Sequence, residues 1–332
     1  MRIIVDGMGG DNAPESTVKG AVEAVKEYGI DVIITGPEEK IQNQLKKYTY
    51  PIEKIMVMDA PEIITNDENP TLAIRRKRNS SLVVGMQALA DGKGEGFVSA
   101  GNTGALLAGG LFIVKRIEGI DRAALTVLYP TLKGVSLLVD AGANMDTKPE
   151  YLSQFASMGS IYMEEVMGVK NPRVGLVNVG TEESKGNQLS KDTFHSLKES
   201  NINFIGNIEA RDLPYGIADV MVCDGFVGNV VLKLTEGMAS SIFSLLKETF
   251  TADFRSKLGA LLLKPQLKIL KKRLDYREHG GAPLLGTTKP VVKAHGSSDY
   301  YAFKNGIGQL KTFIERDVIA AIENKLVDGG IQ

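Results

Sequence analysis

The residues of this chain that could bind an anion follow four short apolar runs. These runs lie at residues 3–6, 97–99, 174–179 and 219–223, and each leads into a loop of small, glycine-rich residues. Such a loop lets a ligand approach the backbone, and a helix that starts there adds unpaired N–H groups and the positive end of its dipole. The pattern therefore predicts a site for phosphate or an oxyanion.

We expect these loops, together with four side chains elsewhere, to form one site. The expected catalytic residues are Lys185, Asn229, Lys233 and His295. The residues expected to bind phosphate or substrate are Gly9, Gly10, Asp11, Ser99, Gly101, Asn102, Thr103, Gly104, Asn144, Asn178, Gly180, Asp224, Gly225, Gly228 and Ser297. Asn229, Lys233 and Glu236 share one helical stripe, which is either a solvated face or a face that points into the cleft.

Other kinds of chemistry have little support in the sequence. The three histidines, His195, His279 and His295, are far apart and there is no cysteine pair, so we expect no metal and no cofactor, although distant carboxylates could still assemble a Mg²⁺ site. Cys223 lies in an apolar strand, where a buried inert thiol is usual. The Gly-x-Ser-x-Gly, Walker A and first-turn Gly-x-Gly-x-x-Gly motifs are absent. What remains suits phosphate as a nucleophile that attacks a thioester.

The composition describes an ordinary globular chain. It has 332 residues, 43% of them hydrophobic, and a net charge of −1, which gives no reason to expect a nucleic-acid partner. A single cysteine fits a reducing cytoplasm. The N-terminus reaches Asp6 after three apolar residues, which predicts no secretory signal, and the longest apolar stretch, 103–114, is too short to span a bilayer.

Strands alternate with helices along the chain. This alternation predicts an α/β fold with a doubly wound, Rossmann-like parallel sheet and ligands beyond the carboxyl ends of its strands. Residues 124–128 and 135–139 are expected to pair. One helix is expected to carry both 75–78 and the apolar residues up to Leu89, and another to cover 300–324. We expect one two-lobed catalytic domain over residues 1–332.

Residues 254–277 depart from this alternation because they combine leucine stripes with many Lys and Arg side chains. Pro265 separates the first stripe from a second that ends at Leu274, which predicts two basic amphipathic helices joined at the proline and protruding from the domain. Such a hairpin could lie on an anionic membrane or pack on a partner subunit. The residues expected to contact the membrane are Leu258, Leu261, Leu262 and Leu263.

Five motifs follow one another along the chain: Val5-Asp-Gly-Met-Gly-Gly-Asp11, Ser99-Ala-Gly-Asn-Thr-Gly-Ala105, Asp140-Ala-Gly-Ala-Asn144, Asp224-Gly-Phe-Val-Gly-Asn229 and His295-Gly-Ser-Ser298. Together and in this order they resemble those of the bacterial acyl-[acyl carrier protein]:phosphate acyltransferases, and the resemblance covers essentially the whole chain. Gly7 departs from the family pattern, since Ala is expected at this position.

The resemblance implies that a long-chain acyl group passes from acyl carrier protein to inorganic phosphate, and that the acyl phosphate then serves a membrane glycerol-3-phosphate acyltransferase in phospholipid synthesis. It also implies a fold like those of isocitrate and isopropylmalate dehydrogenases and phosphate acetyltransferase. The family is homodimeric and associates with the inner face of the plasma membrane from the cytoplasm. The acidic carrier protein could dock on the basic run 75–78 or on the basic hairpin.

Within this resemblance we assign roles to individual residues as hypotheses. Lys185 and Lys233 neutralise phosphate, and Asn229 with nearby N–H groups holds the phosphate or the oxyanion. His295 either protonates the leaving thiolate or is a structural hydrogen-bonding residue. Asp6 and Asp140 are expected to fix loops by accepting N–H bonds.

Three other functions remain open from the sequence. They are a short-chain phosphate acyltransferase that uses coenzyme A, a nicotinamide-dependent hydroxy-acid dehydrogenase suggested only by fold analogy, and a non-catalytic membrane scaffold.

Overall fold

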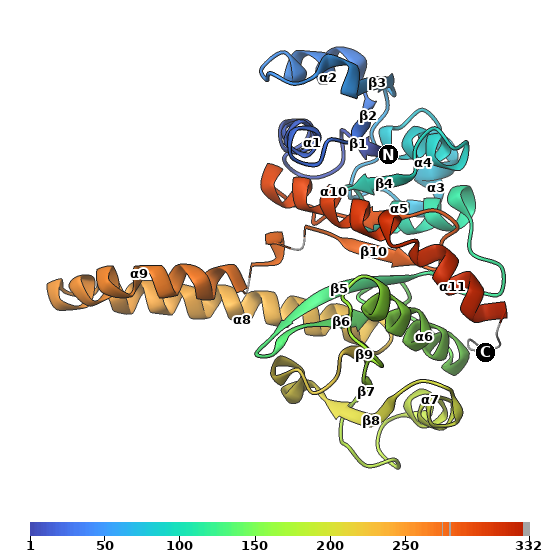
Figure 1. The fold of residues 1–332 in the computed structure, drawn as a ribbon, viewed down its shortest axis with the longest axis vertical. Coiled ribbons are helices and arrows are strands. Elements are labelled where there is room, and N and C mark those ends of the chain that lie inside the picture. Colours follow the sequence, from blue (N-terminus) through green and yellow to red (C-terminus); the bar gives the residue numbers. More distant parts are fainter. Residues whose placement is uncertain (274, 279, 328–332) are drawn as a thin grey trace.

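The computed structural model of the protein describes residues 1–273, 275–278 and 280–327, and its strands form one 11-stranded sheet (Figure 1). The first half of the sheet has the order β3 (Ile55–Asp59), β2 (Asp31–Gly36), β1 (Arg2–Asp6), β4 (Gly96–Ser99) and β11 (Val291–Lys293). The second half has the order β6 (Gly134–Val139), β9 (Val220–Val222), β7 (Val174–Asn178) and β8 (Phe204–Glu209). Between the halves lie β10 (Ala282–Leu285) and β5 (Ala124–Thr131).

Strands are parallel within each half, but the two halves run in opposite directions. β10 is antiparallel to both β11 and β5, and β5 is antiparallel to β6. The expected pairing of 124–128 with 135–139 is thus confirmed, but the expectation of one parallel sheet is wrong. The turn between Thr131 and Gly134 is so short that it can join only antiparallel strands, β5 and β6. The other antiparallel strand, β10, was not predicted from the sequence.

Helices cover both faces of the first half, which we call the N-terminal lobe. Helices α1 (Glu15–Tyr28) and α10 (Tyr300–Glu315) contact each other on one face, and α4 (Ser81–Ala90) and α5 (Thr103–Gly109) lie on the other. Successive β1 side chains alternate between these layers: Ile3 and Val5 pack in the core cluster of α1 and α10, and Ile4 packs in the cluster of α4 and α5.

The second half, the C-terminal lobe, is covered in the same way. Helices α6 (Pro149–Glu165), α7 (Gln188–Glu199) and α11 (Val318–Val327) share a core cluster with Leu137 and Val139 of β6. On the opposite face Leu138 packs with Val227 and Val231, from the start of α8 (Gly225–Thr251). The doubly wound α/β class is therefore confirmed.

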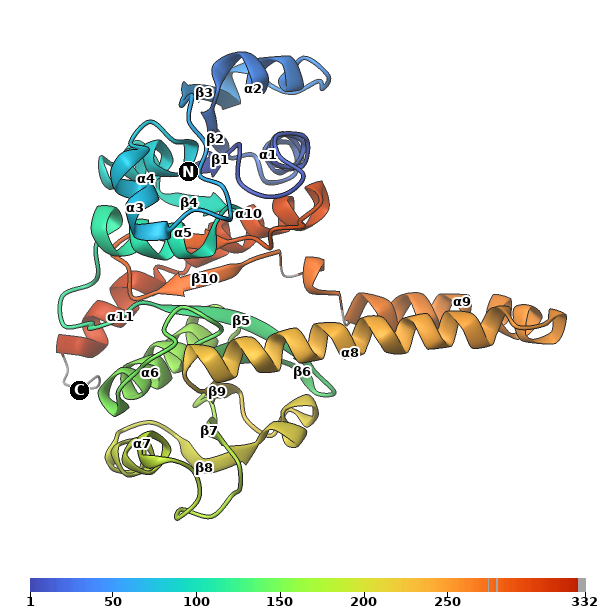
Figure 2. The same ribbon diagram turned by 180° about the vertical axis from the view of Figure 1, so that it is seen from behind.

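A long helical hairpin projects from the sheet. It is formed by α8 and α9 (Phe254–Arg273), as Figure 2 shows from behind. The predicted helix break at Pro265 is wrong, because this residue lies inside α9. A proline removes one backbone hydrogen bond, and in an exposed helix water can satisfy the freed carbonyl. The hairpin therefore turns near Ala252 rather than at the proline, while Leu274 of the predicted second stripe lies outside the described residues.

Two predicted helices are each divided. The helix expected to carry 75–78 and Leu89 consists of α3 (Pro70–Arg76) and α4, where Ser80 accepts a hydrogen bond from the N–H group of Val83. The last helix consists of α10 and α11, and Asp317 between them has a φ of 47°. A capping residue begins a helix, and a residue in the left-handed conformation ends one, at a single position. Apolar periodicity extends over many residues and does not reveal that position. The shorter elements are α2 (Glu38–Leu45), η1 (Ile52–Lys54), η2 (Gly110–Val114), η3 (Ala210–Tyr215) and η4 (Tyr276–Glu278).

Candidate functional site

A cavity of about 1170 Å³ is lined by residues of both lobes. One group of lining residues is polar or exposes backbone, and includes Thr103, Gly104, Asn229, Lys233, Glu236, Lys293, His295 and Ser297. A further charged group at the cavity is Arg277 with its ion-pair partners Asp275 and Asp299. The remainder is largely apolar and includes Leu107, Leu125, Val127, Leu128, Tyr129, Met145, Leu232, Ala239 and Phe243. The cavity can therefore take a molecule with an anionic or polar end and a long apolar part.

Lys233 and His295 bring the two lobes into contact at the polar part of the cavity. The Lys233 ammonium lies 3.3 Å from Nε2 of His295 and 2.8 Å from a carboxylate oxygen of Glu236. Nδ1 of His295 lies 2.8 Å from the Ser297 hydroxyl. An ammonium can only donate, so Nε2 is the acceptor for Lys233, and Nδ1 also accepts from the backbone N–H of Ser297 at 3.3 Å. Burial, and then the charge of Lys233, lower the pKa of His295, which favours the neutral form.

One stripe of α8 faces the cavity. Asn229, Lys233 and Glu236 all line it, so the structure favours the cleft-facing interpretation of this stripe over a solvated face. Asn229 lies against Gly142, where a Cβ would be 3.5 Å from Cβ of the asparagine. Among the described residues the Asn229 amide has no hydrogen-bond partner, which leaves it available to a ligand.

Asp140 organises the loop after β6. One carboxylate oxygen accepts bonds from the N–H groups of Leu125, Gly142 and Ala143, and the other accepts from the backbone and the amide of Asn144. Burial raises the pKa of Asp140, and these hydrogen bonds oppose that rise. Because the Asn144 amide is also bonded to the carbonyl of Ala123, it holds the loop rather than pointing to a ligand.

Asp6 has the corresponding role in the N-terminal lobe. Its carboxylate accepts a 2.6 Å bond from the Ser99 hydroxyl, and that hydroxyl accepts from the N–H group of Gly101. A Cβ on Gly9 would lie 2.6 Å from the Asp6 carboxylate, so these loops can approach only through glycine. Ser99, expected to bind substrate, is instead engaged within the protein.

The remaining loop residues also make contacts within the protein. Asn102 caps α5 and donates to carbonyls of the 65–68 loop, while Asp224 caps α8. A Cβ on Gly225 would lie 2.7 Å from the carbonyl of Asn144. In these loops the predicted residues that do not line the cavity are Gly9, Gly10, Asp11, Ser99, Gly101, Asn102, Asn144, Asp224, Gly225 and Gly228.

The loop after β7 does not join the cavity lining. Asn178 donates its amide to the carbonyl of Lys185, and Gly180 packs against the Lys185 side chain. None of Asn178, Gly180 and Lys185 lines the cavity in the described structure. The site therefore brings together Thr103, Gly104, Asn229, Lys233, His295 and Ser297 from the prediction, and leaves Lys185 apart.

Sequence reasoning missed Lys293. This residue ends β11, is only 8% exposed and lines the cavity. Its ammonium donates to the carbonyls of Ala100 and Ala294. Burial lowers its pKa to about 8. The sequence did carry a signal, because Lys293 lies in an otherwise apolar run directly before the His-Gly-Ser-Ser motif. Such a run predicts a buried strand, and a lysine buried in a strand is rare enough to indicate a specific role.

Neither the single cysteine nor a metal site adds chemistry in the part of the chain that the structure describes. Cys223 is buried, and burial raises the pKa of its thiol far above its usual value, so it is an inert core residue. Among the described residues no cluster of His, Cys, Asp and Glu has the arrangement of a metal site.

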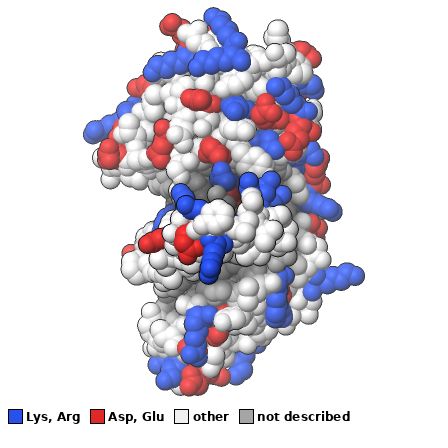
Figure 3. Space-filling view, turned by 90° about the vertical axis from the view of Figure 1, so that its left-hand side faces the viewer, with Lys and Arg blue, Asp and Glu red and all other residues white. Residues whose placement is uncertain are grey.

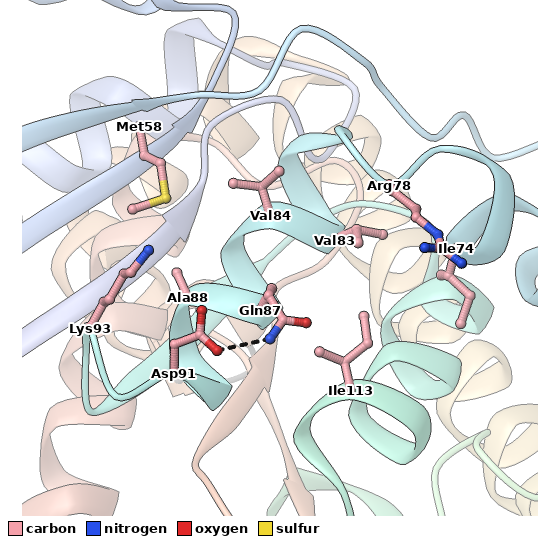
Figure 4. A pocket seen from close by; sticks show the side chains of 10 residues that line it. All are labelled: Met58, Ile74, Arg78, Val83, Val84, Gln87, Ala88, Asp91, Lys93 and Ile113. Carbon is pink, nitrogen blue, oxygen red and sulfur yellow. Dashed lines mark hydrogen bonds between the residues drawn. The ribbon is translucent and has the colours of Figure 1, made fainter.

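A second, smaller cavity of about 420 Å³ lies in the N-terminal lobe (Figure 4). Its walls are largely apolar, with Arg78 and Lys93 among its lining residues. The Gln87 amide is bonded to Asp91. None of the predicted catalytic residues lines this cavity, so the catalytic site is assigned to the larger one.

The hairpin exposes large apolar side chains among basic ones. Leu258, Leu261, Leu262 and Leu263 are all exposed, with Leu262 at 74%. Figure 3 looks at the projecting end, where uncharged surface is flanked by Lys and Arg side chains, with acidic side chains to one side. No helix of the described chain is both long and apolar enough to span a bilayer.

Comparisons with known proteins add an independent observation. Residues 1–321 match a family model described as fatty acid synthesis protein. A phosphate acyltransferase of Alkaliphilus oremlandii is 56% identical over 322 residues, which cover 97% of this chain and 96% of that protein. A phosphate acyltransferase of Clostridium acetobutylicum is 52% identical over 327 residues, which cover 98% of this chain and 99% of that protein.

One solved structure with a similar fold is a phosphotransacetylase from Streptococcus pyogenes. It matches with a TM-score of 0.64 at 18% identity, over 96% of this chain and 94% of that chain. At this identity the likeness concerns the fold alone.

Proposed function

The chain belongs to the fatty acid synthesis protein family and is a phosphate acyltransferase, and from this premise we propose that it transfers a long-chain acyl group from acyl carrier protein to inorganic phosphate. The observation that carries the proposal is the division of one cavity into a cationic part and a long apolar part. The cationic part suits phosphate, and the apolar part suits an acyl chain.

The length of the apolar wall favours a long chain. One face of α8 lines the cavity from Asn229 to Phe243, which corresponds to about 21 Å of helix at 1.5 Å per residue. One leaflet of a bilayer, half of the hydrocarbon core, is about 15 Å thick. A fatty acyl chain of membrane length therefore fits along this helix.

In the proposed reaction an oxygen of hydrogenphosphate attacks the thioester carbonyl carbon. A C–O bond forms and the C–S bond breaks, so that the acyl phosphate dianion leaves together with a thiol. The thiol proton comes from the hydrogenphosphate, which balances the reaction. Lys233 and Asn229 both line the cavity, where Lys233 would neutralise phosphate and the Asn229 amide would donate to the developing oxyanion. His295 is assigned to orientation of Lys233, since its Nε2 accepts from the ammonium.

The carrier protein would deliver its thioester beside α3. This helix contacts α5, whose Thr103 and Gly104 line the cavity. Arg75 and Arg76 are exposed on α3, and the Arg75 guanidinium lies 6.0 Å from the ring centroid of the exposed Phe112. A basic and apolar surface close to the cavity suits an acidic carrier protein.

The proposal predicts that the protein releases thiol from palmitoyl-carrier protein only when inorganic phosphate is present. The acyl product should be trapped by hydroxylamine, because an acyl phosphate is an activated acyl donor. Thiol release measured with and without phosphate, on carrier protein and on acetyl-coenzyme A, is the test.

Preference for acetyl-coenzyme A would replace the proposal with the short-chain acyltransferase. Absence of release with either donor would contradict it, and NAD-linked absorbance change would then test the dehydrogenase alternative. Liposome binding without phosphate-dependent release would support the scaffold alternative.

We further propose that the hairpin contacts an anionic membrane from the cytoplasmic side, where the acyl phosphate meets the glycerol-3-phosphate acyltransferase. Changing Leu258, Leu261, Leu262 and Leu263 to Ser should abolish co-sedimentation with anionic liposomes while thiol release continues, since these exposed side chains lie far along the hairpin from Lys233. Changing Ile52, which is 79% exposed in the N-terminal lobe, to Ser is the control. Liposome binding that survives the four changes would contradict insertion of these leucines.

The homodimer is proposed to use the outer face of α8. An exposed apolar stripe with near-helical spacing runs along this helix, opposite the cavity-lining residues: Phe226, Val230, Leu234, Met238, Ile242 and Leu245. A second copy of the same helix could cover it. The mass measured by light scattering, compared with 35.8 kDa for one chain, tests this assembly.

A further inference from the structure

Lys293 lies at the point where the two lobes and the cavity meet. In the sheet it stands between Ser99 of β4 and Ala282 of β10. Its neighbour Val292 packs on the side of α1 and α10, and Val291 on the side of α4 and α5. Side chains alternate along a strand, so Lys293 points to the α5 side, where Thr103 and Gly104 also line the cavity.

The Lys293 ammonium is buried with few compensating contacts. It has three N–H donors, and two are directed to the carbonyls of Ala100 and Ala294. Among the described residues no carboxylate forms an ion pair with it. Asp6 and Asp11 act on it only through their charge, and Lys233 repels it.

A buried cation of this kind is unfavourable unless something neutralises it. Burial lowers the pKa of Lys293 to about 8, which still leaves the group charged at neutral pH. A structural role in an apolar strand could be filled by an uncharged residue at no such penalty. An anion in the cavity would supply the missing charge.

We propose that Lys293 is a catalytic residue that binds the inorganic phosphate directly with its third N–H donor. This inference rests on the proposed function and extends it, because it places phosphate between Lys293 at the carboxyl end of β11 and Lys233 on α8. The two ammonium groups come from opposite lobes, and Lys293 would supply the positive charge that Lys233, already paired with Glu236, does not supply in full. Phosphate binding would then also hold the lobes together.

The test compares Lys293→Met with the control Lys289→Met, which changes an exposed lysine just before β11. Calorimetric titration with inorganic phosphate alone should show affinity weakened about 10- to 100-fold in Lys293→Met and unchanged in Lys289→Met, as expected for loss of one hydrogen bond to a charged group. Lys293→Arg should restore most of the binding. Thermal unfolding should show that all three variants fold.

A pH series adds a readout that a structural lysine would not give. Phosphate affinity of the wild type should fall above pH 8 as Lys293 loses its proton, and in Lys293→Arg it should not fall there. The other groups that face Lys293 are Asp6, Asp11, Lys233 and His295. His295 has a pKa lowered from its ordinary value, so it does not gain charge in this range.

Equal phosphate affinity in Lys293→Met and the wild type, or no phosphate binding by the wild type, would overturn the proposal. Thiol release is measured separately. Phosphate binding without thiol release in the wild type would contradict the proposed function while leaving the phosphate site at Lys293 supported.

Discussion

Replacing Lys233 with alanine is expected to lower kcat for phosphate-dependent thiol release by about 10²- to 10³-fold, the range measured when one oxyanion-stabilising donor is removed. Lys233 lies at the polar part of the cavity with its ammonium 3.3 Å from His295. The side chain is 51% exposed, so its loss should leave folding intact. Turnover measured with saturating palmitoyl-carrier protein checks this expectation.

Two lysines provide matched controls for this prediction. Lys247→Ala changes an exposed residue farther along the same helix and should have little effect. Lys185 was expected from the sequence to neutralise phosphate, so that Lys185→Ala would cut turnover strongly, whereas the structure keeps Lys185 off the cavity lining. A larger loss in Lys185→Ala than in Lys233→Ala would show that the loop after β7 moves to the substrate and that Lys233 has been given the wrong role.

The second large effect is expected at Ala239, which lies on the cavity face of α8 between Lys233 and Phe243. Changing it to Phe fills the groove, so the end of a long acyl chain must remain outside. Each excluded methylene loses about 0.8 kcal/mol, and three of them lower kcat/KM about 50-fold. Octanoyl-carrier protein, which needs less of the groove, should retain its turnover.

The ratio of kcat/KM for palmitoyl and octanoyl donors is the quantity to measure. A graded series of Ala239→Val, Ala239→Leu and Ala239→Phe should move the preferred chain to shorter lengths step by step. Ser241→Phe, on the same helix but off the cavity lining, should leave the ratio unchanged. An unchanged ratio in Ala239→Phe would mean that the acyl chain lies elsewhere.

Much of the fold follows from local pattern. Apolar runs such as residues 3–6 and 135–139 predict strands because each must be buried, and the glycine-rich turns predict where strands end. The direction of the strands across the sheet could not be predicted from this pattern. It depends on the antiparallel strand β10, which is only four residues long and contains Pro283. A run that short carries too little periodicity to be distinguished from a loop.

The site was predictable only where one element supplied several of its residues. Asn229 and Lys233 are one helical turn apart, so a sequence stripe indicated their shared face. Lys293 and Lys233 are far apart in sequence, and only the packing of the two lobes brings them to one cavity. The polar loop residues Ser99 and Asn144 were expected to bind substrate because side-chain type alone does not reveal a partner inside the protein.

Helix α8 has a consequence for the residence time of the product. It lines the cavity as far as Phe243 and continues to Thr251 at the hairpin turn, beside exposed leucines. Moving ten methylenes of an acyl chain into water opposes release by about 8 kcal/mol, which slows departure roughly 10⁶-fold. A chain that follows α8 outward would pass from one apolar surface to the next without being hydrated. Release of the product after each turnover would then be faster when a lipid phase is present to accept the chain.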